Sequence, residues 1–359
     1  MAAIDRLPRA TLPDRAEPGH APSASVGEAA GRRWRVPTWV RAATLALLPL
    51  AALVELGLGA WQRRHVPRAS DWGAAASAAL AARKPGEAII IAPRWTAENG
   101  RMALAGFRTP LAGAPVGEDA DARIAGRSDL DVFPRVLELS IRGKDDPQTK
   151  GWPLVEQRRF GDVALRILQN PRPERLVRDL ADELDPSAKV SRVDPAGVAE
   201  PCRWEEGGVQ KMPGLFGGPE VPPRRWVCSP WDAQWTFVAP TVMTDLDFVP
   251  RRCILMHPIN DTTTTVELPP RPVGKHVVAY VGLHVFQERD LDKAPVGARV
   301  TVGGVRVAET LHRDGEGWKR FEGTTGALAG SAQPVKIESW AEGGVSAFRL
   351  MCVAVQLRD

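Results

Sequence analysis

Residues Val300–Glu309 read VTVGGVRVAE, followed by GEGWKRFE at Gly315–Glu322 and VKIESW at Val335–Trp340. Apolar, mostly β-branched residues alternate with polar ones in much of this stretch, which is the period of a strand with one buried face. Gly303-Gly304, between two such runs, is the signal of a two-residue β-hairpin. The stretch therefore predicts antiparallel β-structure and is the starting point for the residues on either side.

The same rhythm of short runs separated by turn residues extends over residues 240–359. Hardly any helical period interrupts it, so this region predicts an all-β sandwich. The predicted strands are Arg252–His257, Thr263–Leu268, His276–Val285, Ala298–Val302, Val305–Thr310, Trp318–Glu322, Pro334–Trp340 and Ala347–Gln356.

In the length and spacing of these runs, the region resembles galactose-binding-like jelly-roll modules. We expect such a sandwich to bind carbohydrate or a protein partner at its loop end, with Trp318, Trp340, His312 and Asp314 as candidate ligand-binding residues. His312 with Asp314 is the only histidine–carboxylate pair close together in the sequence, although a solvated hairpin tip would look the same. A tryptophan at the end of a hairpin can also be a lid over the core instead of a sugar platform.

Residues 201–239 predict an irregular connector rich in tryptophan, proline and glycine. The segment has neither a helical nor a strand period, so it needs packing or a cross-link to hold one conformation. Clustered indole rings can stack on the apolar faces of sugars, or they can join the domains on either side. The tryptophans concerned are Trp204, Trp226, Trp231 and Trp235.

The four cysteines divide by predicted region. Cys202 and Cys228 flank the connector, whereas Cys253 and Cys352 lie in the first and last strands predicted for the sandwich. These two strands are often neighbours in a jelly roll, so we predict the bridges Cys202–Cys228 and Cys253–Cys352, with buried free thiols as the alternative. No Cys-x-x-Cys motif supports a zinc or thioredoxin-type site. Disulfides would place these domains outside the cytoplasm.

Residues 69–200 predict a small α/β layer domain, because helices and short strands alternate there. An Ala-rich helix begins after Ser70-Asp71, and a turn leads into the buried run AIIIAP at Ala88–Pro93. A second helix is predicted over Pro173–Leu184, where leucines share one face. Further strands are predicted at Arg135–Ile141, Leu154–Phe160, Val163–Gln169 and Lys189–Val193.

The stretch DWGAAASAALAARKPGEAIIIAPRW, residues 71–95, opens with Asp71-Trp72 on a helix and turns through Pro85-Gly86 into an apolar strand. It resembles the extracytoplasmic domain after the last span of polyprenyl-phosphate-sugar-dependent membrane glycosyltransferases. The resemblance implies an accessory domain of envelope sugar machinery. It carries over no catalytic residue, because the family's catalytic acid lies between early spans that have no counterpart in this sequence.

Residues 42–61, AATLALLPLAALVELGLGAW, predict a single transmembrane helix within 37–62, interrupted by one charge, Glu55. A helix of this length covers about 30 Å of hydrocarbon. A cleaved signal peptide and a buried core helix are the alternatives. Four arginines before the run against three after it favour a cytoplasmic N-terminus, with the later domains periplasmic or extracellular. Residues 1–36 are expected to form a disordered basic tail.

Charge and motifs limit the function. The chain of 359 residues has a formal charge of +4, but seven arginines against four carboxylates place +3 of it in residues 1–41. The remainder therefore has no predicted basic face, and no nucleic-acid partner is expected. We find no nucleophile elbow, zinc-protease helix, P-loop or dinucleotide-binding turn, so no catalytic residue, metal site or cofactor is predicted.

The predicted fold class is α/β plus all-β, with a single transmembrane helix, a small α/β layer domain and a C-terminal, jelly-roll-like β-sandwich at 240–359. We interpret the chain as a single-pass membrane-anchored extracytoplasmic protein that binds carbohydrate or an envelope protein. Whether it is an enzyme is uncertain, and the sequence leans towards a non-enzymatic role. The alternatives are an accessory subunit of an envelope glycosyltransferase system and a purely structural envelope component.

Overall fold

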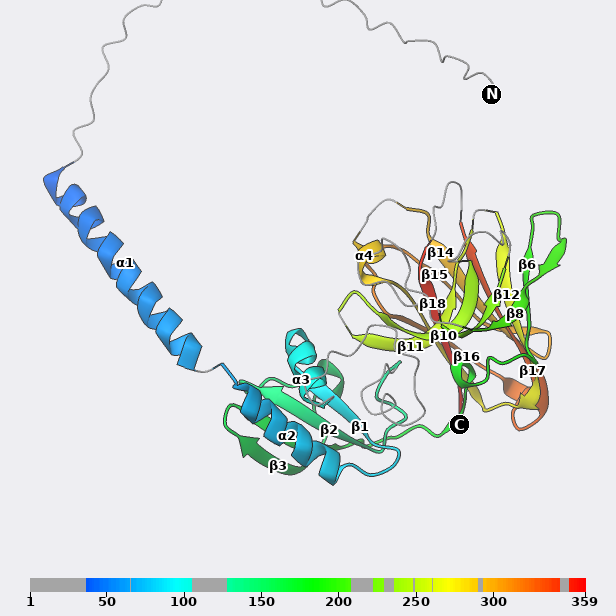
Figure 1. Ribbon diagram of the computed structural model, residues 1–359, viewed down its shortest axis with the longest axis horizontal. Helices are drawn as coiled ribbons and strands as arrows, with labels where there is room; N and C mark the ends of the chain where they lie inside the picture. The colour runs from blue at the N-terminus through cyan, green and yellow to red at the C-terminus, as the bar shows by residue number, and fades with distance from the viewer. Residues whose placement is uncertain are drawn as a thin grey trace, which may run out of the picture. The chain divides into compact units, whose positions relative to one another are not determined.

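The computed structural model describes residues 37–64, 66–104, 128–207, 222–228, 236–247, 249–259, 261–289, 293–342 and 349–359. The chain separates into two compact units, Met1–Arg64 and His65–Asp359. The first contains helix α1 (Thr38–Arg64), and the second contains all the strands labelled in Figure 1. The tail predicted at 1–36 lies outside the described residues.

Helix α1 is 27 residues long and includes the stretch in which a helix is predicted. In the described part of the chain, however, no helix is both long and apolar enough to cross a membrane. Pro49 and Glu55 interrupt the apolar residues of α1, and Arg63 and Arg64 end it. The prediction of a single transmembrane helix is therefore wrong, and the fold class is mostly β. The predicted single-pass localisation depended on that helix and is wrong for the same reason, and the structure does not show the predicted membrane partner.

A small α/β layer follows α1. Its elements are α2 (Ala69–Ala82), β1 (Ala88–Ala92), α3 (Ala97–Leu104), β2 (Arg135–Ile141), β3 (Leu154–Phe160) and β4 (Val163–Gln169). In the sheet order β1-β2-β4-β3, β1 and β2 run parallel, and the other neighbours run antiparallel. Helices α2 and α3 cover one face (Figure 1), where Trp72 and Ala75 pack against Leu137 and Leu165. The predicted first helix and these four strands are confirmed.

An eight-stranded sheet forms one layer of a sandwich. Its strands are β5 (Leu176–Asp179), β8 (Arg203–Glu206), β9 (Arg224–Val227), β10 (Phe237–Thr244), β11 (Pro250–Met256), β13 (His276–Leu283), β16 (Lys319–Thr324) and β18 (Met351–Arg358). The order is β16-β13-β18-β11-β10-β9-β8. Strand β5 pairs with the end of β18, beyond the residues of β18 that pair with β11.

A six-stranded sheet forms the second layer. Its strands are β6 (Lys189–Val193), β7 (Ala199–Pro201), β12 (Thr263–Pro272), β14 (Val296–Val302), β15 (Val305–His312) and β17 (Ala332–Ala341). The order is β15-β14-β17-β12-β6-β7. Gly303 and Gly304 join β14 to β15 with φ of +56° and +82°, so the predicted hairpin is confirmed.

Alternate residues of the two sheets meet in one apolar core. Val296 and Ala298 of β14 face this core together with Val281 of β13 and Val353 of β18. Residues between them on each strand point to the outer faces. This packing of two sheets face to face confirms the predicted β-sandwich. The predicted division into 69–200, 201–239 and 240–359 stays a prediction.

The helix predicted over Pro173–Leu184 is wrong. Residues 176–179 form β5 and residues 180–182 form a single 3₁₀ turn, η4 (Leu180–Asp182). The Asp179 carboxylate accepts a hydrogen bond from the Ala181 N–H, which begins that turn. Because β5 pairs with β18, its backbone hydrogen bonds are satisfied across the sheet and not along a helix. Leu180 and Leu184 are buried in the sandwich core, so their spacing reflects burial without a helix.

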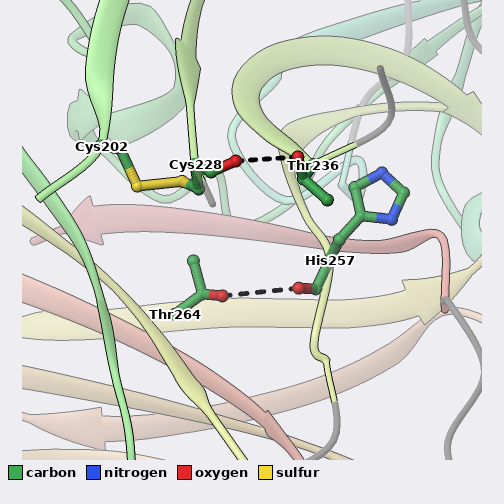
Figure 2. Close-up of a disulfide and its surroundings, with 5 residues drawn as sticks. All are labelled: Cys202, Cys228, Thr236, His257 and Thr264. Atoms are coloured by element: carbon green, nitrogen blue, oxygen red, sulfur yellow. Dashed lines mark hydrogen bonds between the residues drawn. A yellow bond between two sulfur atoms is a disulfide. The ribbon is translucent and has the colours of Figure 1, made fainter. Parts of the chain in front are cut away.

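Both predicted disulfides, Cys202–Cys228 and Cys253–Cys352, are confirmed. The first joins the two flanks of the predicted connector, and the Cys228 carbonyl also accepts a hydrogen bond of 2.9 Å from Thr236 (Figure 2). The second links neighbouring strands, since β11 pairs directly with β18. Trp231 and Trp235 of the connector lie outside the described residues.

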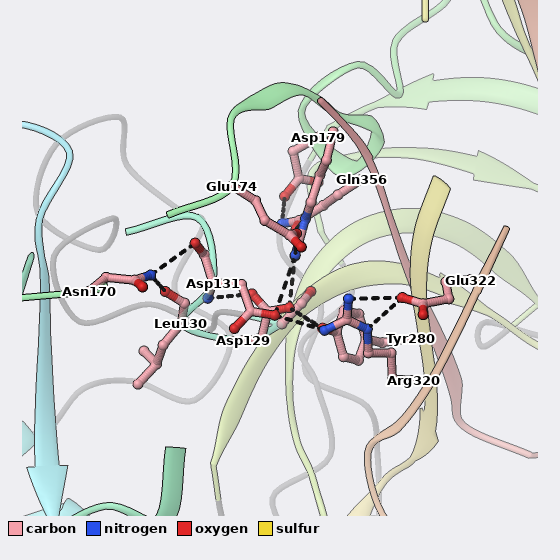
Figure 3. A network of polar contacts seen from close by, with 12 residues as sticks. Asp129, Leu130, Asp131, Asn170, Glu174, Asp179, Tyr280, Arg320, Glu322 and Gln356 are labelled. Carbon is pink, nitrogen blue, oxygen red and sulfur yellow. Dashed lines mark hydrogen bonds and ion pairs between the residues drawn. The ribbon is translucent and has the colours of Figure 1, made fainter. Parts of the chain in front are cut away.

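A buried polar network attaches residues 128–131, which precede β2, to the outer face of the eight-stranded sheet. Arg358, only 1 % exposed in its side chain, lies 2.8 Å from Asp129 and 2.6 Å from Glu174. Tyr280 donates its hydroxyl to Asp129, and Arg320 lies 2.7 Å from Asp131 (Figure 3). Burial and the adjacent carboxylate raise the pKa of Tyr280, so it remains a neutral donor. The charges in this network are partnered, so the network holds residues 128–131 against the eight-stranded sheet.

Candidate functional site

His312, at the end of β15, has a side chain with no exposed surface. Its Nε2 lies 2.7 Å from Oε1 of Glu288, which belongs to the short helix α4 (Val285–Glu288). The same carboxylate accepts hydrogen bonds from the Leu283 N–H at 3.1 Å and from the Gly315 N–H at 2.8 Å. His312 therefore connects α4 with the loop between β15 and β16.

Asp314, in that loop, forms an ion pair with Arg349. The side chains of Asp314 and Arg349 are 5 % and 0 % exposed. The backbone N–H of Lys293 also donates to Asp314, at 3.3 Å. The structure thus places His312 and Asp314 at the same end of the sandwich, where each ties the loop to a different neighbour. Both side chains face inward, so their geometry supports a positioning role for the loop.

Trp318 lies on the outer face of the eight-stranded sheet. Its ring stacks on Tyr280 with centroids 5.9 Å apart and planes inclined by 5°, and the guanidinium carbon of Arg251 lies 5.5 Å from the ring centroid. A Cβ added at Gly282 would overlap the ring, so the indole also lies over the backbone of β13. The half-buried ring packs against the apolar cluster that contains the Cys253–Cys352 bridge. Trp318 therefore covers the apolar cluster on the outer face of this sheet, which is the alternative to a sugar platform.

Trp340 lies on the opposite side of the sandwich, on the outer face of the six-stranded sheet. It pairs across strands with Gly297, and a Cβ added there would overlap the indole ring. The glycine therefore allows the ring to lie over β14. The guanidinium carbon of Arg299 lies 5.0 Å from the ring centroid. The half-buried indole is thus held over the sheet beside a cation.

Two carboxylates position Arg299 beside the indole. Its Nε donates to Glu309 on β15 at 2.8 Å, and its Nη1 lies 3.6 Å from Glu338 on β17. The hydrogen bond from Arg299 lowers the pKa of Glu309, so this group is a carboxylate at neutral pH. Ring, guanidinium and two carboxylates occupy adjacent positions on three neighbouring strands. We call these four residues, Trp340, Arg299, Glu309 and Glu338, the Trp340 cluster.

The sequence predicted Trp318 and Trp340 as one site, but they lie on opposite faces of the sandwich. Arg299, Glu309 and Glu338 were missed. The alternation of residues along the strand could have indicated Arg299. Gly297 and Arg299 lie between the buried residues Val296, Ala298 and Val300, so they belong to the outer face of the sheet. Among the described residues, no group of three or more histidine, cysteine, aspartate or glutamate side chains could hold a metal ion.

Comparison with known proteins gives only distant likenesses. No protein-family model matches the chain, and no curated protein matches it. The predicted resemblance of residues 71–95 to glycosyltransferases therefore gains no support.

Solved structures with a partial likeness to this chain include the CBM51-2 and INT domains of Clostridium perfringens ZmpB in complex with GlcNAc. That structure is 13 % identical and has a TM-score of 0.29, with 61 % of this chain and 40 % of that chain covered. A family 43 arabinoxylan arabinofuranohydrolase from Bacillus subtilis in complex with cellotetraose is 11 % identical, with a TM-score of 0.23 and coverage of 62 % and 40 %. The chain spans less than half the length of these structures. Likenesses at these TM-scores carry no argument about this chain.

Proposed function

We propose that the β-sandwich binds carbohydrate on the outer face of the six-stranded sheet, at the Trp340 cluster. The observation that carries this proposal is the position of the Trp340 indole over Gly297, with Arg299 5.0 Å from its centroid. A sugar ring has an apolar C–H face and a rim of hydroxyl groups. It therefore suits a site that combines an indole with charged hydrogen-bonding groups.

Each residue of the cluster has a part in this proposal. The indole stacks on the apolar face of the sugar, whereas Arg299 donates to hydroxyl oxygens and Glu309 accepts from hydroxyl groups. The ion pairs of Arg299 with Glu309 and Glu338 reduce the conformational freedom that binding would otherwise remove. Trp318 suits this task less well, because its ring stacks on Tyr280. His312 and Asp314 support the neighbouring loop.

A protein partner on the same face is the competing occupant, since tryptophan and arginine are also enriched in protein interfaces. The proposed role is binding, without a chemical step. No specific observation favours the alternative of a glycosyltransferase accessory subunit or that of a purely structural envelope component.

A glycan array probed with the full chain tests the proposal, followed by titration with the best glycan. We expect Trp340→Ala to lower the affinity at least tenfold, because loss of a stacking ring removes the central contact. Trp95→Ala is the matched control, since Trp95 is 68 % exposed and lies in the α/β layer. Equal binding by wild type and Trp340→Ala, or an array without any bound glycan, contradicts the proposal.

A further inference from the structure

Strand β3 is an edge strand of the small α/β sheet. It pairs with β4 on one side, and in the described ranges no strand pairs with its other side. Leu154 and Val155 at its start are 50 % and 57 % exposed. An exposed edge presents backbone N–H and C=O groups that can pair with another strand.

The residues of β3, LVEQRRF, are complementary to a second copy of themselves. When two copies run antiparallel and are centred on Gln157, Glu156 of each copy lies opposite Arg158 of the other. Gln157 then lies opposite its own counterpart. Opposite charges directly across strands stabilise a sheet, so the two Glu156–Arg158 pairs favour this register.

The local geometry leaves these charges available. Arg158 Nε lies 2.5 Å from Glu156 Oε1 within the strand, and the two side chains remain 50 % and 42 % exposed. In the paired arrangement, two glutamates and two arginines would alternate around the centre. The β-bulge of β3 falls between Leu154 and Glu156, so Glu156–Phe160 is the regular part of the strand and contains that centre.

We propose that two copies of this chain associate through β3, antiparallel about a two-fold axis at Gln157. The two four-stranded sheets then continue into each other across the axis. A single self-complementary strand generates a closed dimer, because a two-fold axis uses the same surface on both copies. The proposal does not depend on carbohydrate binding, since β3 belongs to the α/β layer and the Trp340 cluster belongs to the sandwich.

A charge exchange in the full chain tests the register, with the dimer dissociation constant measured by sedimentation velocity. Arg158→Glu places like charges opposite each other twice, so we expect it to weaken the dimer about tenfold or more. Glu156→Arg has the same effect. The double variant Glu156→Arg/Arg158→Glu restores opposite pairs and should return the dissociation constant to within about threefold of the wild type.

Arg159→Glu is the matched control, because it makes the same change of charge at a position outside the two Glu156–Arg158 pairs. It should change the dissociation constant less than about threefold. A chain that stays monomeric at about 100 µM, or single variants that weaken the dimer without rescue by the double variant, would overturn the proposal. Circular dichroism of each variant separates loss of association from loss of folding.

A disulfide trap gives an independent test. Gln157→Cys brings two thiols together at the axis, where Cα atoms of opposite residues are about 4.5–5.5 Å apart, within disulfide range. Mild oxidation should then produce a covalent dimer, with no competition from the native cysteines, which are all paired. Arg159→Cys is the control, because its two copies would lie about 13 Å apart and should not cross-link. Equal cross-linking by both variants contradicts the register.

Discussion

The guanidinium group of Arg358, on the last strand of the sandwich, lies 2.8 Å from the carboxylate of Asp129, 229 residues earlier in the chain. Neither group has much access to water, with 1 % and 6 % of the side chains exposed. Each therefore relies on the other, and on Glu174 and Tyr280, for the interactions that water would supply. This pair fastens the end of β18 to the segment that leads into the α/β sheet.

Removing one partner of this pair should destabilise the protein strongly. We expect Asp129→Ala to lower the free energy of unfolding by about 3–5 kcal/mol, because it leaves a buried guanidinium without its main partner. The measurement is urea unfolding of the full chain. Arg203→Ala is the control, since it breaks an exposed ion pair with Glu205 and should cost about 0–1 kcal/mol. A loss of only about 0–1 kcal/mol from Asp129→Ala, as expected for the exposed pair, would contradict a strong contribution of the network.

Gly297 should be essential for the position of Trp340. We expect Gly297→Ala to displace the indole and to weaken glycan binding at least tenfold, because the added methyl group would overlap the ring. The matched control is Gly282→Ala, which makes the same change beneath Trp318. It should lower stability by about 1–3 kcal/mol and leave glycan affinity unchanged. Loss of affinity in both variants would point to a general disturbance of the sandwich.

The free energy of unfolding should fall on acidification because the imidazole of His257 is buried. Figure 2 shows this residue, whose backbone carbonyl accepts a hydrogen bond from the Thr264 hydroxyl. Burial and nearby Arg192 lower the pKa of His257 to about 3. The unfolded chain therefore binds more protons than the folded chain between about pH 6.5 and pH 3. His257 stabilises the fold fully above this window, and the loss is about 1.4 kcal/mol per pH unit within it.

His257→Gln removes this titrating group, so its free energy of unfolding should change less between pH 7.5 and pH 5. Urea titrations at several pH values compare the two slopes. The difference between wild type and variant isolates His257 from the carboxylates that also titrate. Parallel slopes would be inconsistent with a buried neutral imidazole.

The two disulfides should differ in their contribution to stability. Cys253–Cys352 closes a sequence separation of 99 residues, whereas Cys202–Cys228 closes 26. In the chain-entropy model, removing the disulfide that closes the longer loop lowers the free energy of unfolding by about 4.7 kcal/mol. Removing the disulfide that closes the shorter loop lowers it by about 3.5 kcal/mol. Urea unfolding of two double variants, each with one pair of cysteines replaced by alanine, measures the stability that each disulfide contributes. A larger loss of stability in the Cys202/Cys228 double variant would contradict the prediction.

Strands were predictable where their residues alternate in polarity or form a short apolar run. The runs Arg135–Ile141 and Val163–Gln169 coincide with β2 and β4. Strand β10 was missed because Pro240 interrupts it; the proline is tolerated because β9 pairs only with Phe237 and Val238. The spacing of Leu176, Leu180 and Leu184 suggested a helix, although long-range pairing with β18 decides the structure there.

The candidate site was only partly predictable. The sequence singled out Trp340, but it could not show which face of the sandwich each tryptophan occupies. Trp318 immediately precedes β16, and its ring extends over Gly282 of β13, so its place depends on tertiary packing. The companions of Trp340 come from three strands, and their proximity depends on the cross-strand register of β15, β14 and β17.

Strand β18 pairs with β13 along one side and with β11 and β5 along the other. Residues 351–358 therefore occupy the middle of a sheet whose other members are all encoded upstream. During translation, the sheet cannot be completed until this segment has been synthesised, so the apolar surfaces of the upstream strands stay exposed until then. A nascent chain arrested before this point would be expected to bind chaperones, and removal of residues 351–358 should leave a chain that accumulates as aggregate.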